Sequence, residues 1–201
     1  MMKTLLPVHF AIFLDMMTST IILPLQAPLI FKNDGILPET FLQHERTIIF
    51  GALLIVYPFA LALGAPLLGA ASEKIGRKRV LIVTLAGTLI GTLLNGAGML
   101  TKSISFIFLG KFINGFTGAN MAIGQAIISD HGREESVTSN FGYLFASMAM
   151  GRIVGPFFGG KLSDTAVVSW FSFATPFWFA GILIILNIIF VAVVFKEVPK
   201  D

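Results

Sequence analysis

The chain has 201 residues, of which 55% are hydrophobic and 12% are charged, with a formal net charge of +3. Soluble domains contain about 25% charged residues, so this composition excludes a soluble domain, a disordered chain and a nucleic-acid-binding protein. The sequence contains no cysteine, which excludes disulfides, thiol catalysis and thiolate metal sites. We therefore interpret the chain as an integral membrane protein.

Six apolar segments are long enough to cross a bilayer, for which about 20 helical residues are needed. They indicate helices rather than barrel strands, because the apolar residues run continuously instead of alternating. We expect one all-α domain over residues 1–201, with transmembrane helices at 5–30, 47–70, 80–100, 104–129, 140–162 and 176–195.

Basic residues predict the orientation, because cytoplasmic loops carry an excess of Lys and Arg. With a cytoplasmic N-terminus, the inside holds eight basic residues (Lys3, Lys74, Arg77, Lys78, Arg79, Arg133, Lys196 and Lys200) and the outside holds four (Lys32, Arg46, Lys102 and Lys161). We therefore expect both termini in the cytoplasm.

The first span contains an acidic residue, Asp15, near its middle. A charge at the bilayer centre costs about 2.5–3.5 kcal/mol on insertion scales, so this carboxyl group should face a cavity or a partner. A carboxyl group balanced between burial and a nearby cation can carry a proton or bind a cation. A structural ion pair with Lys111 or Arg152 is the alternative.

The second span is followed by a short loop bounded by glycines, Gly69-Ala70-Ala71-Ser72-Glu73-Lys74-Ile75-Gly76-Arg77-Lys78-Arg79. We expect a tight turn in which Glu73 and Arg77, four residues apart, can form an ion pair. A charge cluster that serves membrane orientation alone would explain the basic residues but not the two glycines.

The fourth span has one polar, small-residue face with helical spacing, formed by Lys111, Asn114, Gly118, Met121 and Gln125. The fifth span adds Arg152, whereas the third and sixth spans contain no charge. We therefore expect spans one, two, four and five to surround a polar cavity, and spans three and six to face lipid. For Asn95 and Asn187 we favour hydrogen bonds between helices.

The fifth span is rich in glycine, with Gly142, Gly151, Gly155, Pro156, Gly159 and Gly160. Glycines spaced by four let another helix backbone approach closely, and a proline inside a helix bends it. We expect an interface and a bend here, with ordinary small-residue packing as the alternative.

Spans two and five end alike, which predicts an internal repeat. Pro66 and Pro156 each begin a Pro-x-x-Gly stretch, and a Ser followed by an acidic residue comes shortly after both. Three spans in each repeat would make the second copy inverted. We therefore predict two inverted three-helix repeats, with a chance similarity of two apolar helix ends as the alternative.

These motifs together resemble those of the major facilitator superfamily. The loop is similar to the family signature Gly-x-Leu-Ala-Asp-Arg-x-Gly-Arg-Lys, with Gly69, Gly76, Arg77 and Lys78 matching, Lys74 in place of Arg and Glu73 in place of Asp. The glycines and proline of the fifth span fill every position of the antiporter motif Gly-x8-Gly-x3-Gly-Pro-x2-Gly-Gly. Asp15 followed by Pro24 resembles the first helix of the drug and tetracycline antiporter branch, and Lys111 stands where a fourth-helix motif has a buried Arg.

The resemblance is to the N-terminal six-helix half of a twelve-helix fold. It implies half of a proton-coupled secondary transporter, antiporter-like or efflux-like, which moves a small-molecule substrate by alternating access. The second six-helix half would be a separate chain or a second copy, and the membrane would be a bacterial inner (plasma) membrane.

The resemblance also implies roles for individual residues. Asp15 would couple protons, and the cavity candidates are Asp15, Lys111, Asn114, Gln125 and Arg152. The cytoplasmic gate would comprise Gly69, Glu73, Lys74, Gly76, Arg77, Lys78 and Asp130, and the span-five motif would pack against the other half. Lys111 keeps the charge of the usual Arg but loses its planar fork.

Other six-helix classes leave motifs that this sequence lacks, such as the Asn-Pro-Ala triplets of aquaporins and the Gly-x-Ser-Gly of rhomboid proteases. We find no catalytic constellation, so we expect neither an enzyme nor a cofactor. His131 with Glu134 and Glu135 is interpreted as a solvated loop rather than a metal site. The alternative function is a non-transporting membrane subunit, or a truncated half-transporter, acting as a structural or binding module.

Overall fold

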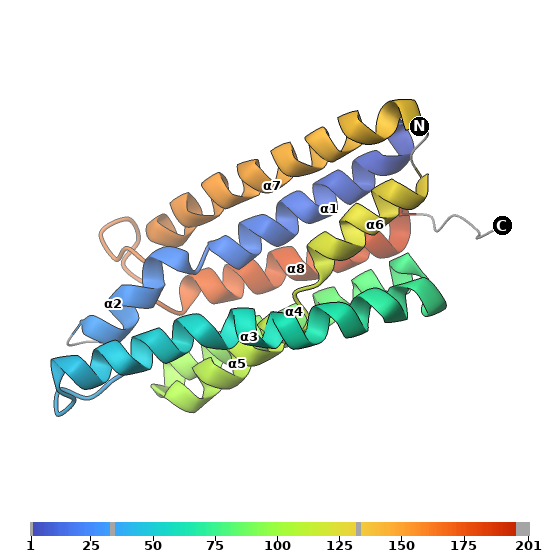
Figure 1. Ribbon diagram of the computed structural model, residues 1–201. Helices are drawn as coiled ribbons and strands as arrows, with labels where there is room; N and C mark the ends of the chain where they lie inside the picture. Colours follow the sequence, from blue (N-terminus) through green and yellow to red (C-terminus); the bar gives the residue numbers. More distant parts are fainter. Residues whose placement is uncertain (1, 33–34, 132–133, 196–201) are drawn as a thin grey trace.

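The computed structural model describes residues 2–32, 35–131 and 134–195, which form a bundle of long helices (Figure 1). The elements are α1 (Met2–Thr20), the 3-10 turn η1 (Leu23–Leu25), α2 (Gln26–Phe31), α3 (Gln43–Ile75), α4 (Arg77–Thr101), α5 (Ile104–Phe116), α6 (Asn120–His131), α7 (Glu134–Leu162) and α8 (Thr175–Val194). The described residues contain no strand. The predicted all-α membrane architecture is confirmed.

Among the described residues, five helical segments are long and apolar enough to cross a membrane: Leu5–Phe31, Gln43–Ile75, Arg77–Thr101, Val137–Leu162 and Thr175–Val194. The predicted fourth span differs, because α5 and α6 are separate helices joined by residues 117–119. At this joint the Thr117 hydroxyl donates to the Ile113 carbonyl, 2.8 Å away, and the Gly118 amide donates to Gly115 in a tighter turn. Glycine also has a low intrinsic preference for helix, which favours an interruption here without being sufficient for one.

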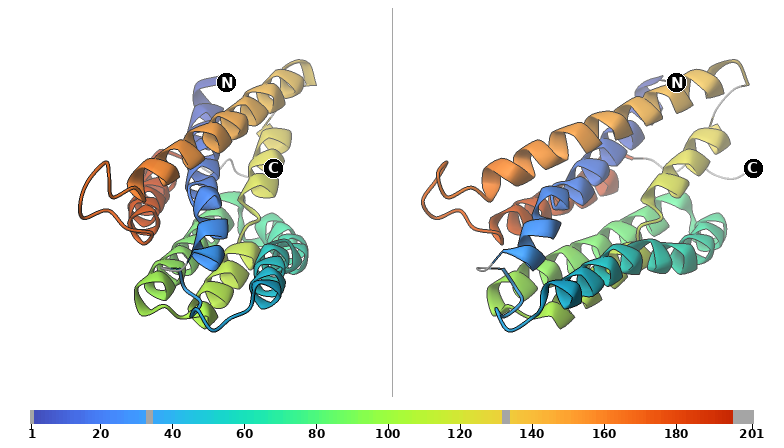
Figure 2. Two further views of the ribbon diagram at one scale, coloured as in Figure 1. Left: turned by 90° about the vertical axis from the view of Figure 1, so that its left-hand side faces the viewer. Right: turned by 60° about the vertical axis from the view of Figure 1, so that its left-hand side comes forward.

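The helices pack in pairs that relate the two halves of the chain. The first span, α1, packs against the fifth, α7, as the fourth, α5, packs against the second, α3 (Figure 2). Gly64 of α3 lies against the backbone of Phe116, and Gly155 of α7 lies against the backbone of Met17. α1 and α5 run in opposite directions (Figure 1), so the arrangement agrees with two inverted three-helix repeats.

The charged loop lies at the end of the bundle where α1 begins and α8 ends, which we call the terminal end (Figure 1). The Lys78 ammonium group donates to the carbonyl oxygen of Ala192 in α8, 2.7 Å away. The turn is a single residue, Gly76, whose φ of 111° is strained for any residue with a side chain. Because α3 continues to Ile75, Gly69 lies within a helix rather than at the edge of the loop.

Two apolar clusters close the interior at opposite ends. The cluster toward the terminal end includes Leu5, Ile12, Leu81, Ile127 and Leu144, and the one toward the opposite, distal end comprises Leu29, Ile30, Ile36, Leu37, Leu53 and Ile107. Both clusters gather side chains from several helices, so burial of apolar surface holds the bundle together at its two ends.

The third span does not simply face lipid as expected. α4 packs between α5 and α8 and buries Thr84, Thr88, Thr92 and Asn95. The Thr84 and Thr88 hydroxyls donate to the carbonyl oxygens four residues earlier, each 3.0 Å away, so their burial leaves no unsatisfied donor. α8 agrees better with the expectation, because Ile182, Leu186 and Val193 are exposed.

Arg46 is buried at the distal end and holds the segment between α2 and α3. Its guanidinium group donates to the carbonyl oxygens of Ile30, Leu37, Pro38 and Phe41. Only 5% of this residue is exposed, so it has a structural role in this segment.

Candidate functional site

A cavity of about 350 Å³ lies between the helices, with a mainly apolar wall into which polar side chains are set. Its polar lining is Asp15, Thr18, Ser19, Thr20, Gln26, Tyr57, Thr88, Thr92, Asn95, Lys111, Asn114, Asn120 and Arg152. These residues come from the predicted four spans and from α4. Apolar side chains such as Phe50, Leu54, Ile107 and Phe177 complete the wall, giving the mixed surface that small-molecule sites usually have.

Asp15 is 4% exposed and lies on α1 at the cavity wall. One of its carboxylate oxygens accepts a hydrogen bond from the Asn120 amide, with Oδ1 and Nδ2 2.8 Å apart. Within the described part of the chain, Asp15 makes no ion pair with Lys111 or Arg152 within 4.0 Å. The structural ion pair considered from the sequence is therefore not formed.

The two cavity cations lie on other walls. The Lys111 ammonium group on α5 donates to Gln26 Oε1, 3.0 Å away. Arg152 on α7 lines the cavity but is exposed on the outside of the bundle. The cavity thus presents one acidic group and two basic groups from different helices, and can contact either charged end of a ligand.

The break between α5 and α6 changes which residues of the fourth span reach the cavity. Lys111, Asn114 and Gly118 line it as expected, but Gln125 and Met121 do not. The expectation treated the span as one continuous helix, and the interruption at residues 117–119 takes α6 out of register with α5. Gln125 is therefore removed from the cavity candidates.

The bundle interior contains four amide groups whose Oδ1 atoms are buried without a hydrogen-bond partner among the described residues, those of Asn95, Asn114, Asn120 and Asn187. The Asn187 amide donates to the carbonyl oxygen of Ala11, 2.9 Å away, which is the interhelical bond expected of it. The Oδ1 atoms of Asn95, Asn114 and Asn120 are buried and accept no hydrogen bond from any described residue. These three oxygen atoms belong to residues that line the cavity but are themselves inaccessible, so a ligand donor reaches them only if the amide groups turn toward the cavity.

The residues of the charged loop meet α6 at the terminal end. Arg77 Nε lies 2.9 Å from Asp130 Oδ2 and Arg77 Nη2 lies 3.8 Å from Glu73 Oε1. The Arg77 guanidinium group also donates to the Ser72 hydroxyl. Lys74 is exposed. The loop motif therefore connects α3, α4 and α6 through a single arginine.

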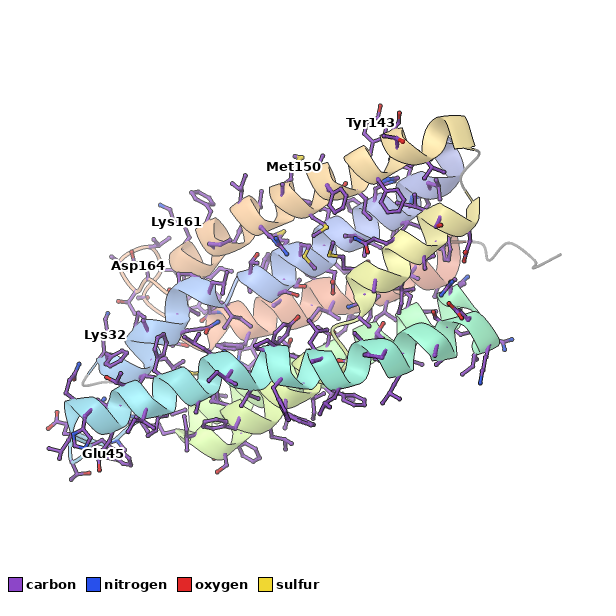
Figure 3. The ribbon with its side chains drawn as sticks, viewed as in Figure 1. Lys32, Glu45, Tyr143, Met150, Lys161 and Asp164 are labelled. Carbon is purple, nitrogen blue, oxygen red and sulfur yellow. The ribbon has the colours of Figure 1, made fainter. Side chains whose placement is uncertain are left out.

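The glycines of the fifth span require a correction. Gly151, Gly155 and Gly159 lie against backbone atoms of residues 13–21, so α1 of the same chain fills the seam that we expected another six-helix half to occupy. A Cβ at Gly142 or Gly160 would meet nothing within 4 Å. Tyr143 and Met150 point away from the bundle (Figure 3). Pro156 lies inside α7, which runs unbroken to Leu162.

Some residues of the cavity wall were not predicted from the sequence. Asn120, the partner of Asp15, gave no signal beyond its place after a Thr-Gly pair. Thr88, Thr92 and Asn95 share one face of α4, and their spacing of four and three residues was the available signal. The side chains of His131, Glu134 and Glu135 lie outside the described residues, among which no group of three His, Asp or Glu could hold a metal.

The family model for the Major Facilitator Superfamily matches residues 8–201. The chain belongs to this superfamily. Its relatives include the tetracycline resistance protein, class E, of Escherichia coli, 35% identical over 87% of this chain and 40% of the relative. The class H protein of Pasteurella multocida is 30% identical over 100% of this chain and 46% of its own length. The quinolone resistance protein NorA of Staphylococcus aureus is 24% identical, over 100% and 47%.

A solved transporter structure shares this fold. The human organic anion transporter MFSD10 (TETRAN) superposes with a TM-score of 0.79 at 20% identity, covering 97% of this chain and 47% of that one. The chain thus spans about half the length of the proteins it matches, and the match supports a half of the superfamily fold.

Proposed function

We propose that this six-helix unit is half of a proton-coupled transporter of the antiporter or efflux type. It works with a second six-helix unit and moves a small solute by alternating access. The relatives' names, tetracycline and quinolone resistance proteins, support a drug-like organic substrate. A cavity of about 350 Å³ falls in the size range of small-molecule pockets.

The position of Arg152 is the observation that supports a second six-helix unit. This arginine lies well inside the membrane helix α7, lines the cavity and is exposed on the surface of the bundle. A charged side chain facing hydrocarbon there would cost several kcal/mol. Exposed apolar side chains of α3 and α7, among them Phe59, Leu63 and Ile153, flank the same region. A second unit that covers this side would give Arg152 an enclosed polar cavity.

Asp15 is the proposed coupling carboxylate. Its side chain is buried, accepts a hydrogen bond from Asn120 and forms no ion pair with the described cavity cations. It can therefore hold a proton without breaking a salt bridge. Antiport then requires that proton and substrate compete for this carboxylate: a substrate with a cationic group displaces the proton, and a proton displaces the substrate.

The charged loop is the proposed cytoplasmic gate. The Arg77–Asp130 pair joins α4 to α6 at the terminal end, and opening toward the cytoplasm would separate these helices. This proposal places both termini in the cytoplasm, in a bacterial inner membrane. Externally added maleimide should then fail to label a cysteine introduced at Ile75, which is 55% exposed at that end.

The experiment that tests the function is proton-driven accumulation of tetracycline in reconstituted vesicles. Asp15→Asn removes the titratable group and should abolish accumulation driven by a proton gradient. Asp164→Asn, an exposed acid outside the membrane helices, is the matched control and should leave accumulation unchanged. Full proton-coupled transport by the Asp15→Asn protein would refute the coupling role.

Two further measurements separate this proposal from a structural module. A structural role for Asp15 predicts that Asp15→Asn destabilises the protein and that the added change Lys111→Gln restores stability. The proposal predicts a folded single variant and no such rescue. Transport is measured for the chain alone and with any co-purified chain, whose mass identifies the second unit. No transport by either preparation would favour a non-transporting subunit.

A further inference from the structure

The helix α6 has a functional group of the proposed mechanism at each of its ends. Asn120, its first residue, donates to the Asp15 carboxylate across 2.8 Å, and Asp130, next to its last residue, lies 2.9 Å from Arg77 Nε. At 1.5 Å per residue, the 12 residues of α6 span about 18 Å. One short helix therefore reaches from the cavity to the charged loop.

The other end of the fourth span is separated from α6 by the break at residues 117–119. The Thr117 amide donates to Ile113 and the Gly118 amide donates to Gly115, and the next bond across the break runs from the Ile123 amide to Ala119. Gly118 lies beside the Tyr57 hydroxyl at the cavity wall. A break of this kind lets α6 change its direction without moving α5 as one rod.

Asn120 is suited to sense the charge of Asp15. Only 1% of this residue is exposed, and its Oδ1 accepts no hydrogen bond from any described residue, although its Nδ2 is engaged. An ionised carboxylate can only accept, so it uses the Nδ2 donor alone. A protonated carboxyl group also donates, and it can pair with both atoms of the Asn120 amide group when Oδ1 turns toward it. Protonation thus adds a second hydrogen bond and turns or draws the amide toward α1.

The rest of α6 is built to move as one body. Ile123, Ile127 and Ile128 are buried in the apolar cluster of the terminal end. Apolar contacts have no directional requirement, so a small slide or tilt keeps them, whereas the Arg77–Asp130 bond at the far end depends on distance and angle. A movement of Asn120 should therefore change the distance between Arg77 and Asp130.

We propose that Asn120 is a positioning residue for Asp15, and that α6 transmits the protonation of Asp15 to the Arg77–Asp130 pair. This rests on the proposed coupling role of Asp15. The other ionisable groups at the cavity are Tyr57 on α3, Lys111 on α5 and Arg152 on α7. The cavity-lining residues of α4 are uncharged, and α8 contains no charged residue between Thr175 and Val194.

The test measures the distance between α6 and the charged loop. Cysteines are introduced at two exposed positions, Ile75 and Ser129, in the full chain, which contains no other cysteine. Nitroxide labels there report the distance distribution by electron paramagnetic resonance. Asp15→Asn, which can both donate to and accept from Asn120 as the protonated acid does, should shift the distribution by about 2 Å, the scale of helix shifts in switching proteins.

A double-mutant comparison decides whether the shift passes through Asn120. In an Asn120→Ala background Asp15→Asn should produce no shift, and in an Asn120→Gln background, which keeps the amide, it should produce a partial one. The matched control is Asn187→Ala, which removes an equally buried amide that also contacts α1, through Ala11, and should leave the shift intact. Thermal unfolding of each variant in detergent verifies that it is folded.

Two results would overturn the proposal: no shift on Asp15→Asn in the otherwise unchanged chain, or the same shift in the Asn120→Ala background. The label distances are measured without any transport. If Asp15→Asn abolishes coupled transport but leaves the distances unchanged, the role of α6 is refuted and the coupling role of Asp15 remains. If the distances shift but Asp15→Asn still couples protons, the coupling role of Asp15 fails, and with it the proposed transmission of protonation.

Discussion

Replacing Gly151 by Ala tests the seam between α7 and α1. A Cβ at this position would lie 2.6 Å from the Phe13 carbonyl oxygen and 2.9 Å from Met16 Cβ, whereas carbon atoms pack at about 3.5–4.0 Å. The nearest obstructing atom belongs to the backbone of α1, so the two helices must separate by about 1 Å. Overpacking of this kind costs about 1–3 kcal/mol.

Gly142→Ala in the same helix is the matched control, because a Cβ there meets nothing within 4 Å. Alanine favours helix over glycine by about 1 kcal/mol at both positions, so the difference between the variants isolates the overlap. We expect the free energy of unfolding to be about 1–3 kcal/mol lower for Gly151→Ala than for Gly142→Ala. It is measured by titration with sodium dodecyl sulfate, followed by far-ultraviolet circular dichroism. Equal transition midpoints would refute the close packing of these helices.

Three other changes address the ends of the bundle. Asp130→Asn should raise the rate at which maleimide labels a cavity cysteine from the terminal end more than Glu73→Gln does. The reason is that Asp130 lies 2.9 Å from Arg77, whereas Glu73 lies 3.8 Å from it and is 65% exposed. Equal labelling rates would contradict this. Arg46→Lys should speed hydrogen exchange of residues 35–42 about ten- to a hundredfold, since each hydrogen bond from a charged group contributes about 1.5–3 kcal/mol. The control is Arg79→Lys at an exposed position, which should leave exchange of these residues unchanged. Gly76→Ala should lower stability by about 1–3 kcal/mol, the cost of a sparsely populated backbone conformation, given its φ of 111° and ψ of 141°. An unchanged denaturation midpoint would speak against that strain.

The membrane helices were predictable because a long apolar run by itself demands a helix in a bilayer. α4 and α8 appear close to the predicted positions for this reason. The break in the fourth span was not predictable, because neither Thr117 nor Gly118 alone ends a helix. It depends on tertiary contacts, since Thr117 packs against Gly87 and Gly118 lies beside Tyr57.

The charged part of the cavity was predictable for a similar reason. Asp15, Lys111 and Arg152 stand out within apolar runs, and all three line the cavity. Asn120 was not found, because its contact with Asp15 exists only once α6 has left the line of α5. Thr88 gave little signal because a threonine in a membrane helix satisfies its hydroxyl within its own turn.

The helix that packs against the glycines of α7 also could not be predicted from the sequence. Glycine spacing shows that a backbone approaches α7, but any neighbouring helix would satisfy it. The structure places α1 against Gly151 and Gly155, and Ile21, the residue after α1, against Gly159. The superfamily resemblance suggested a partner in the other half, and contacts within the chain took that place instead.

The close seams have a mechanical consequence for the six-helix unit. α1 lies against the glycines of α7, and α5 lies against Gly64 of α3. Two helices in such close contact are stiffer than either helix alone, so each pair should resist bending and sliding. Compliance is then concentrated in the short joints, residues 117–119 between α5 and α6 and residues 21–25 between α1 and α2. Bending of the unit should therefore occur mainly at those two joints, both of which contribute residues to the cavity wall, so the cavity lies close to the axis of that bending.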